Sequence, residues 1–134
     1  MGNKLEDEIN KAYYANEKYN VLATFAMVYH EKKISIKKMG KFLRSTDKFF
    51  HIDNNHYFII FHYTIHDNAY KASQNLLLKL DEYFQNLSTS IAISSFNGTK
   101  SPTIVINRLK QIIEEVKKSS FTRIEDESIL DSQI

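Results

Sequence analysis

Apolar residues recur at helical spacing in four segments of the chain, and the first two lie in its N-terminal third. Residues 4–18 form an amphipathic pattern with acidic residues in the first turn, where the helix dipole favours them. A second helix is expected from a cap at Ser35 to about residue 43. Its predicted inward-facing residues are Ile36, Met39, Phe42 and Leu43.

The other two helices are predicted in the second half of the chain. The third has its cap near Asp67 or Asn68, and its apolar positions recur three and four residues apart at Ala69, Ala72, Leu76, Leu77, Leu80, Tyr83 and Phe84. The fourth starts at Ser101-Pro102, where the hydroxyl caps the helix and proline fills the first helical position. We expect it to end near Lys118.

Continuous apolar runs and turn residues predict four strands. Residues 20–30 lack Gly and Pro and are rich in aromatic and β-branched types, which is typical of a central strand buried on both faces. Residues 48–63 predict a β-hairpin around Asp53-Asn54-Asn55, because Asp and Asn tolerate the left-handed conformations of tight turns. Residues 88–95 predict the last strand.

This order of elements indicates an α/β (α+β) fold. Helices between strands imply crossover connections, and one antiparallel hairpin makes the sheet mixed, with helices on its faces. We expect one domain at residues 1–118. Residues 119–134 are polar and acidic, so we interpret them as a flexible tail or a linker.

Composition limits the classes of function. The chain has no cysteine, which excludes disulfides and thiolate metal sites, and no apolar run is long enough to span a membrane, so we expect a cytoplasmic protein. Its formal net charge is +2, and four acids against one base, Arg123, lie in the tail. A mild basic excess in residues 1–118 suits an anionic small ligand or an acidic protein and is too small to indicate nucleic acid.

Several weak local patterns together resemble a GGDEF domain, whose catalytic version condenses two GTP molecules into cyclic di-GMP in bacterial signalling. The resemblance covers roughly residues 5–118. Its first strand resembles NVLATFAMVYH after Tyr19, its hairpin region resembles KFLRSTDKFFHIDNNHYFIIF, and its last helix resembles SPTIVINRLKQIIEEVKK. The resemblance implies a nucleotide-cyclase or ferredoxin-like sheet with a central hairpin.

The resemblance also implies that catalytic residues are missing. The signature pentapeptide falls on Asp53-Asn54-Asn55-His56-Tyr57, so both glycines that admit the phosphates carry side chains. The two magnesium-binding acids fall on His56 and near Tyr29. Few residues replace the guanine-recognising helix after His30. We therefore expect no catalysis, no catalytic residue and no cofactor, although Lys117 occupies the place of a lysine that faces phosphates.

The spacing of Arg44 and Asp47 matches the RxxD motif that binds the product in this family. Arginine can donate two hydrogen bonds to guanine while a carboxylate accepts from its N–H groups. Lys41 and Lys48 are candidate phosphate-side residues. The simpler interpretation is that Arg44 contacts helix carbonyls, Asp47 shapes the turn, and the lysines face solvent.

Three functions follow from these patterns. The first is an inactive GGDEF-like regulatory module that binds a protein partner or forms a homodimer through its first helix or its hairpin. The second is a cyclic di-GMP receptor using Arg44 and Asp47. The third is an enzyme with relocated metal ligands, for which Asp47, Asp53 and Asp67 are the nearby acids. The five histidines also suggest a surface metal site, in which His51 would pair across the hairpin with a residue near His56, but we expect no metal.

Overall fold

The computed structural model of the chain describes residues 2–94, 98, 100–119 and 121–131, and it contains a five-stranded sheet in the order β2-β3-β1-β4-β5. The strands are β1 (Ala23–Tyr29), β2 (Asp47–Asp53), β3 (His56–His62), β4 (Ser90–Ser94) and β5 (Ile124–Asp126). Strand β1 pairs antiparallel with β3 and β4, and β5 pairs parallel with β4. The predicted mixed sheet is therefore confirmed.

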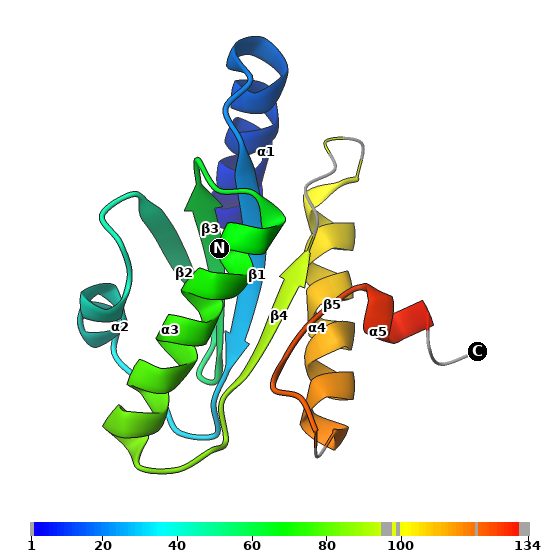
Figure 1. Ribbon diagram of the computed structural model, residues 1–134. Coiled ribbons are helices and arrows are strands. Elements are labelled where there is room, and N and C mark those ends of the chain that lie inside the picture. Colours follow the sequence, from blue (N-terminus) through cyan, green and yellow to red (C-terminus); the bar gives the residue numbers. More distant parts are fainter. Residues whose placement is uncertain (1, 95–97, 99, 120, 132–134) are drawn as a thin grey trace.

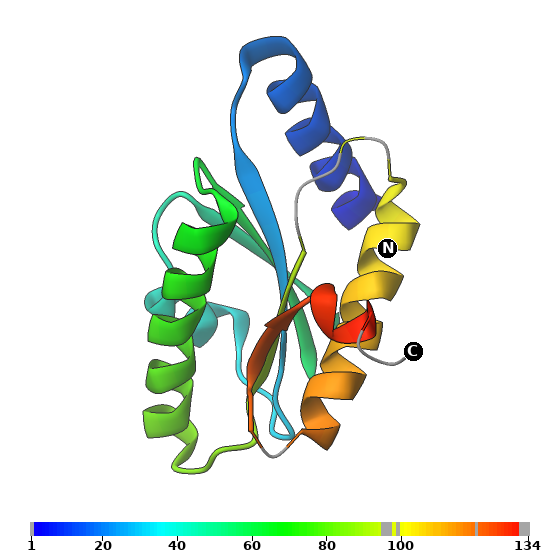
Figure 2. The ribbon, with the colours of Figure 1, turned by 45° about the vertical axis from the view of Figure 1, so that its right-hand side comes forward.

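Helices cover both faces of this sheet, as Figures 1 and 2 show. They are α1 (Gly2–Tyr19), α2 (Ile36–Phe42), α3 (His66–Phe84), α4 (Pro102–Lys118) and α5 (Ser128–Asp131). Helices α1 and α4 bury one face, and α2 and α3 bury the other. None of the helices in the described part of the chain is long and apolar enough to cross a membrane.

Strand β1 lies at the centre of the sheet and contributes to both cores. Phe25 and Met27 pack in the cluster under α1 and α4, while Ala26 and Val28 pack in the cluster under α2 and α3. Successive side chains of a strand point to opposite faces, so an unbroken apolar run fits this position. The prediction of a doubly buried central strand is confirmed.

The helix starts agree with the sequence in two cases and differ in one. Ser35 accepts a hydrogen bond from the N–H of Lys38, and Ser101 accepts one from the N–H of Ile104, as expected of N-caps. Helix α3 instead begins after Ile65, which makes no side-chain cap hydrogen bond. Asp67 and Asn68, which the sequence predicts near the cap, lie inside the first helical turn and do not serve as the cap themselves.

Two residues predicted to face inward are exposed. Ile36 is 41% exposed and Tyr83 is 46% exposed. Helix α2 has seven residues, so it offers a narrow inner face to the edge strand β2, and Met39 fills that face. The ring of Tyr83 packs against Phe42 at the outer boundary between α2 and α3, with 5.9 Å between ring centroids.

The hairpin forms where the sequence predicts it, although by a different backbone conformation. Strands β2 and β3 are joined at Asn54 and Asn55, and the Asp53 carboxylate accepts a hydrogen bond from the N–H of Asn55 at 2.9 Å. Among the described non-glycine residues, positive φ occurs at Asn20, Tyr63 and Gln85 and not in this turn. The side chain of Asp53, rather than a left-handed residue, therefore stabilises the turn.

The C-terminal segment is folded against the domain, so the prediction of a flexible tail is wrong for residues 121–131. Strand β5 extends the sheet, and Ile124 is buried in the core under α3. Arg123 donates two hydrogen bonds to the Asp81 carboxylate of α3, at 2.7 and 2.8 Å, and one to the carbonyl of Thr89. The domain therefore continues past Lys118.

The bidentate contact of Arg123 predicts a measurable contribution to stability. Arg123→Ala removes three hydrogen bonds made by a charged donor, so the free energy of unfolding is expected to fall by about 2 kcal/mol in urea denaturation. Lys118→Ala is the control, because its exposed pair with Glu115 should contribute no more than about 0.5 kcal/mol. Equal stability of the two variants would show that this arginine does not hold β5 in place.

Candidate functional site

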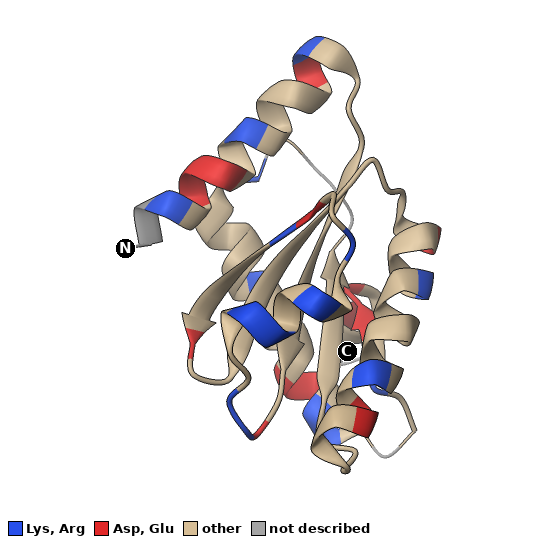
Figure 3. Cartoon of the chain, turned by 90° about the vertical axis from the view of Figure 1, so that its left-hand side faces the viewer, with Lys and Arg blue, Asp and Glu red and all other residues tan. Residues whose placement is uncertain are grey.

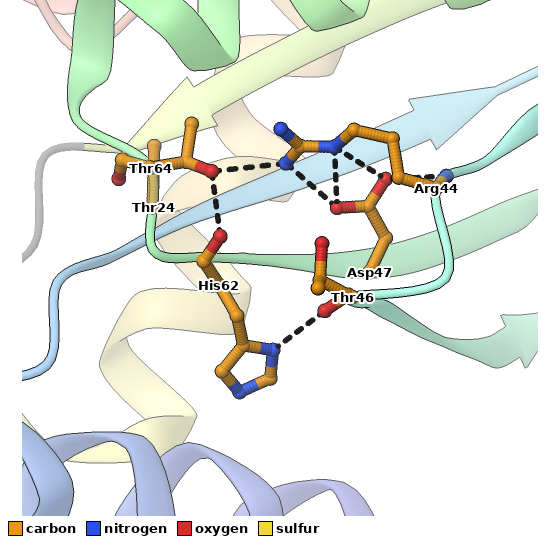
Figure 4. Close-up of polar contacts among 6 residues, drawn as sticks. All are labelled: Thr24, Arg44, Thr46, Asp47, His62 and Thr64. Carbon is orange, nitrogen blue, oxygen red and sulfur yellow. Dashed lines mark hydrogen bonds and ion pairs between the residues drawn. The ribbon is translucent and has the colours of Figure 1, made fainter.

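Arg44 and Asp47 face each other across the connection from α2 to β2. The Asp47 carboxylate accepts hydrogen bonds from the backbone N–H of Arg44 at 2.9 Å and from its Nη2 at 2.8 Å. Nε of Arg44 also lies 3.1 Å from Oδ1 of Asp47. Nη2 donates a further bond to the hydroxyl of Thr64, which links the pair to the start of α3 (Figure 4). The structure brings the two predicted residues together as an internal ion pair.

The carboxylate of Asp47 is not accessible to a ligand in this arrangement. Its side chain is 1% exposed, against 48% for Arg44, and both of its oxygens accept bonds from Arg44. The adjacent cavity, of about 90 Å³, is lined by Phe42, Leu43, Arg44, Asp47, Phe61, Ala72, Asn75 and Lys79. Ligand pockets usually measure roughly 300 Å³ or more, so a nucleotide does not fit inside. Asp47 shapes the turn, as the simpler interpretation expects, whereas the side chain of Arg44 bonds to Asp47 and Thr64 rather than to helix carbonyls.

The two candidate phosphate-side lysines do not join Arg44 and Asp47 in one site. Lys48 follows Asp47 in β2 and therefore points to the opposite face of the sheet. There its Nζ pairs with Glu8 of α1 at 3.2 Å. Burial raises the pKa of Glu8, but the hydrogen bond and charge of Lys48 outweigh it and lower the pKa overall. Lys41 is exposed on α2.

Four polar side chains at the hairpin turn and the start of β3 bind other groups of the protein. Asp53 lies 2.8 Å from Nδ1 of His56, and the side-chain amide of Asn55 donates to the carbonyls of His30 and Glu31 at 3.0 Å. Burial raises the pKa of Asp53, but the contacts with His56 and the N–H of Asn55 lower it overall. Tyr57 is buried, and its hydroxyl donates to the carbonyl of Ile34. The hairpin is thus tied to the segment after β1.

The side-chain ammonium of Lys117 lies at the end of β1. Nζ of Lys117 lies 4.0 Å from the ring centroid of Tyr29, and the same ammonium pairs with Glu114 at 3.1 Å. The ring of His56 packs on Tyr29 with 5.1 Å between centroids. Next to this group is a cavity of about 400 Å³ lined by Tyr29, Glu31, Leu87, Ser88, Thr89, Ser90, Val116, Lys117, Ser119 and Arg123. Sequence reasoning missed this cavity, because its walls come from four separate segments.

His30 organises one wall of the cavity. Its ring stacks on Phe84, Nδ1 accepts from the N–H of Lys32 at 2.8 Å, and Nε2 lies 2.9 Å from Oδ1 of Asn86. Since Nδ1 is the acceptor, Nε2 carries the proton and donates it. The hydroxyl of Ser88, 2.8 Å from Nε2, therefore has no base to activate it here. This contact is structural and joins residues too distant in sequence to be predicted from a motif.

The histidines do not assemble a metal site in the described residues, where no group of three or more His, Cys, Asp or Glu could hold an ion. His51 lies across the hairpin from Tyr57 rather than from His56, and its ring packs on that tyrosine. His56 is held between Asp53 and Tyr29. His51 therefore pairs with the neighbour of His56, as predicted, but the rings of the two histidines pack on different tyrosines.

The fold of this chain is similar to that of solved GGDEF domains. No protein-family model matches the sequence, and no curated protein matches it. The GGDEF domain of DgcB from Caulobacter crescentus, solved in complex with c-di-GMP, superposes with a TM-score of 0.72 at 11% identity, over 92% of this chain and 88% of that one. The FimX GGDEF domain from Pseudomonas aeruginosa gives 0.70 at 13% identity, over 89% of each chain.

A third similar structure is a complex of two proteins. The diguanylate cyclase SiaD from Pseudomonas aeruginosa, solved with its activator SiaC, superposes with a TM-score of 0.71 at 10% identity, over 92% of this chain and 56% of SiaD. Identities this low establish the architecture and no more. The chain has the fold of a GGDEF domain.

Proposed function

We propose that this chain is a non-catalytic module of GGDEF fold that serves cyclic di-GMP signalling by binding a protein. The observation that carries the proposal is the ammonium of Lys117 on the ring of Tyr29, with His56 against the same ring. Phosphoryl transfer from GTP needs magnesium held by carboxylates. The ammonium of Lys117 and the rings of Tyr29 and His56 lie at the junction of β1 and the hairpin, and none of these groups is a carboxylate that could hold magnesium.

The acids near this junction are committed to other partners. Asp53 contacts His56 and the N–H of Asn55, and Glu114 pairs with Lys117. Asp47 lies at the other end of β2 from Asp53, a separation of roughly 20 Å for six residues of strand. These two acids cannot share one ion, which argues against an enzyme with relocated ligands.

A cyclic di-GMP receptor is the second candidate, and the half-exposed guanidinium of Arg44 favours it. DgcB, which has the same fold, was solved with this ligand. The buried carboxylate of Asp47 weighs against it, because guanine would need Asp47 to release Arg44 before it could accept a bond. Protein binding needs no such rearrangement, and SiaD in complex with its activator is the precedent for a protein partner.

The first test measures both nucleotides. We expect the purified chain to show no magnesium-dependent turnover of GTP. In calorimetry at modest salt, we also expect no binding of cyclic di-GMP that depends on Arg44, so the unmodified chain and Arg44→Ala should give the same heats. Lys71→Ala, which removes an exposed positive charge from α3, is the matched control. GTP turnover would overturn the claim of a non-catalytic module, and micromolar binding lost in Arg44→Ala alone would establish the receptor.

The second test measures what the ion pair does for the fold. Asp47→Asn keeps the size of a buried side chain but removes the charge that accepts from Arg44, so we expect a loss of about 2 kcal/mol in the free energy of unfolding. Arg44→Ala should cost a similar amount, and the double variant should cost less than the sum, because the two residues share one interaction. Strict additivity in urea denaturation would show that the pair is not a structural element.

A further inference from the structure

One segment of the chain carries a strong excess of positive charge. Residues 32–48 contain six lysines and Arg44 against a single acid, Asp47, which gives a formal charge of +6 in a chain whose net charge is +2. Asp47 is buried and neutralised by Arg44. The rest of the molecule must therefore be acidic overall.

Four lysines of this segment are exposed and form what we call the basic end: Lys32, Lys33, Lys37 and Lys41. The ion pairs among the described residues involve none of them, whereas Lys48 pairs with Glu8, and Lys38 lies over the rings of Phe42 and Tyr83. Figure 3 shows basic residues along α2 and in the loop that precedes it. The charge of the basic end is not balanced locally.

The C-terminal segment carries the opposite charge. Residues 124–131 contain four acids and no base, and we call these acids the acidic end: Glu125, Asp126, Glu127 and Asp131. All four are at least partly exposed. Asp126 lies 3.1 Å from Nε2 of His66 and accepts from Ser128, so Glu125 and Asp131 are the better positions for changing the charge without disturbing the fold.

The strand order places these two ends on opposite edges of the molecule. Helix α2 packs on the edge strand β2, and β5 is the last strand at the other edge. Figure 1 shows α2 and α5 on opposite sides of the sheet. Four strand spacings amount to roughly 20 Å, more than the Debye length of about 8 Å at physiological salt. The two ends cannot neutralise each other within one molecule.

An exposed apolar side chain accompanies each end. Phe121, just before β5, is 98% exposed, and Ile36 lies among the lysines of α2. An interface needs apolar contact as well as charge, since electrostatic complementarity mainly sets orientation and rate of association. Each end thus offers a charged surface with one apolar contact.

We propose that the protein partner of this module is a second copy of the chain, with the basic end of one copy docked on the acidic end of the next. This inference rests on the proposed function, because it names the partner. A symmetric dimer through either end would bring like charges together, whereas a head-to-tail contact pairs opposite charges and leaves a free end for another copy. The assembly is a chain or a ring of copies.

The test is sedimentation velocity of the full 134-residue chain at low and high salt. We expect concentration-dependent association at about 20 mM salt that disappears near 500 mM, because screening shortens the Debye length to a few ångströms. Lys37→Glu with Lys41→Glu changes the formal charge of the basic end from +4 to 0, and Glu125→Lys with Asp131→Lys changes that of the acidic end from −4 to 0. Each double variant should associate about tenfold more weakly or worse.

Mixing the two variants separates this proposal from a general effect of charge. Neither variant has complementary ends, but an equimolar mixture does, so association should return in the mixture alone. Lys4→Glu with Lys18→Glu, on exposed positions of α1, is the control for net charge and should associate like the unmodified chain. An unmodified chain that stays monomeric at low salt, or a mixture that fails to associate, would overturn this inference. GTP turnover would instead overturn the proposed function.

Discussion

The burial of β1 on both faces is the constraint on which the rest of the structure depends. A strand that turns Phe25 and Met27 to one side and Ala26 and Val28 to the other must be covered by helices twice. Helices α1 and α4 supply one layer, and α2 and α3 supply the other. Because crossover connections then reach both faces, the two helical layers of the fold follow from this one buried strand.

The same constraint explains why the polar groups near β1 make hydrogen bonds within the protein. The backbone just after β1 is still partly buried, so its carbonyls take partners within the protein. Asn55 donates to the carbonyls of His30 and Glu31, and His30 is in turn held by Lys32 and Asn86. Glycines in this turn would leave the backbone open to phosphates, whereas these side chains close the hairpin onto the segment after β1. Stability and ligand access therefore compete for the same positions.

The sequence predicts the elements well where a period or a local cap defines them, and it fails where distant residues meet. The apolar stripe of α3 and the cap at Ser101 are local patterns, and both are confirmed apart from the start of α3 and the exposure of Tyr83. The sequence does not predict strand β5, because a strand of three residues is too short to show a hydrophobic period. Its contact from Arg123 to Asp81 also joins residues that are 42 positions apart in the sequence. The RxxD spacing identified a real contact, but whether Asp47 is buried depends on tertiary packing that spacing does not encode.

The two edges of the sheet decide how molecules of this kind can meet. Strand β2 has a register shift between His51 and Asp53 and carries Lys48, and β5 has only three residues. Bulges, edge lysines and short edge strands are features that prevent backbone pairing between sheets. Contacts between molecules at these edges must therefore be made by side chains. Since charge is separated between the two edges, the side chains that meet there carry opposite signs, and the architecture favours a directional contact over a symmetric one.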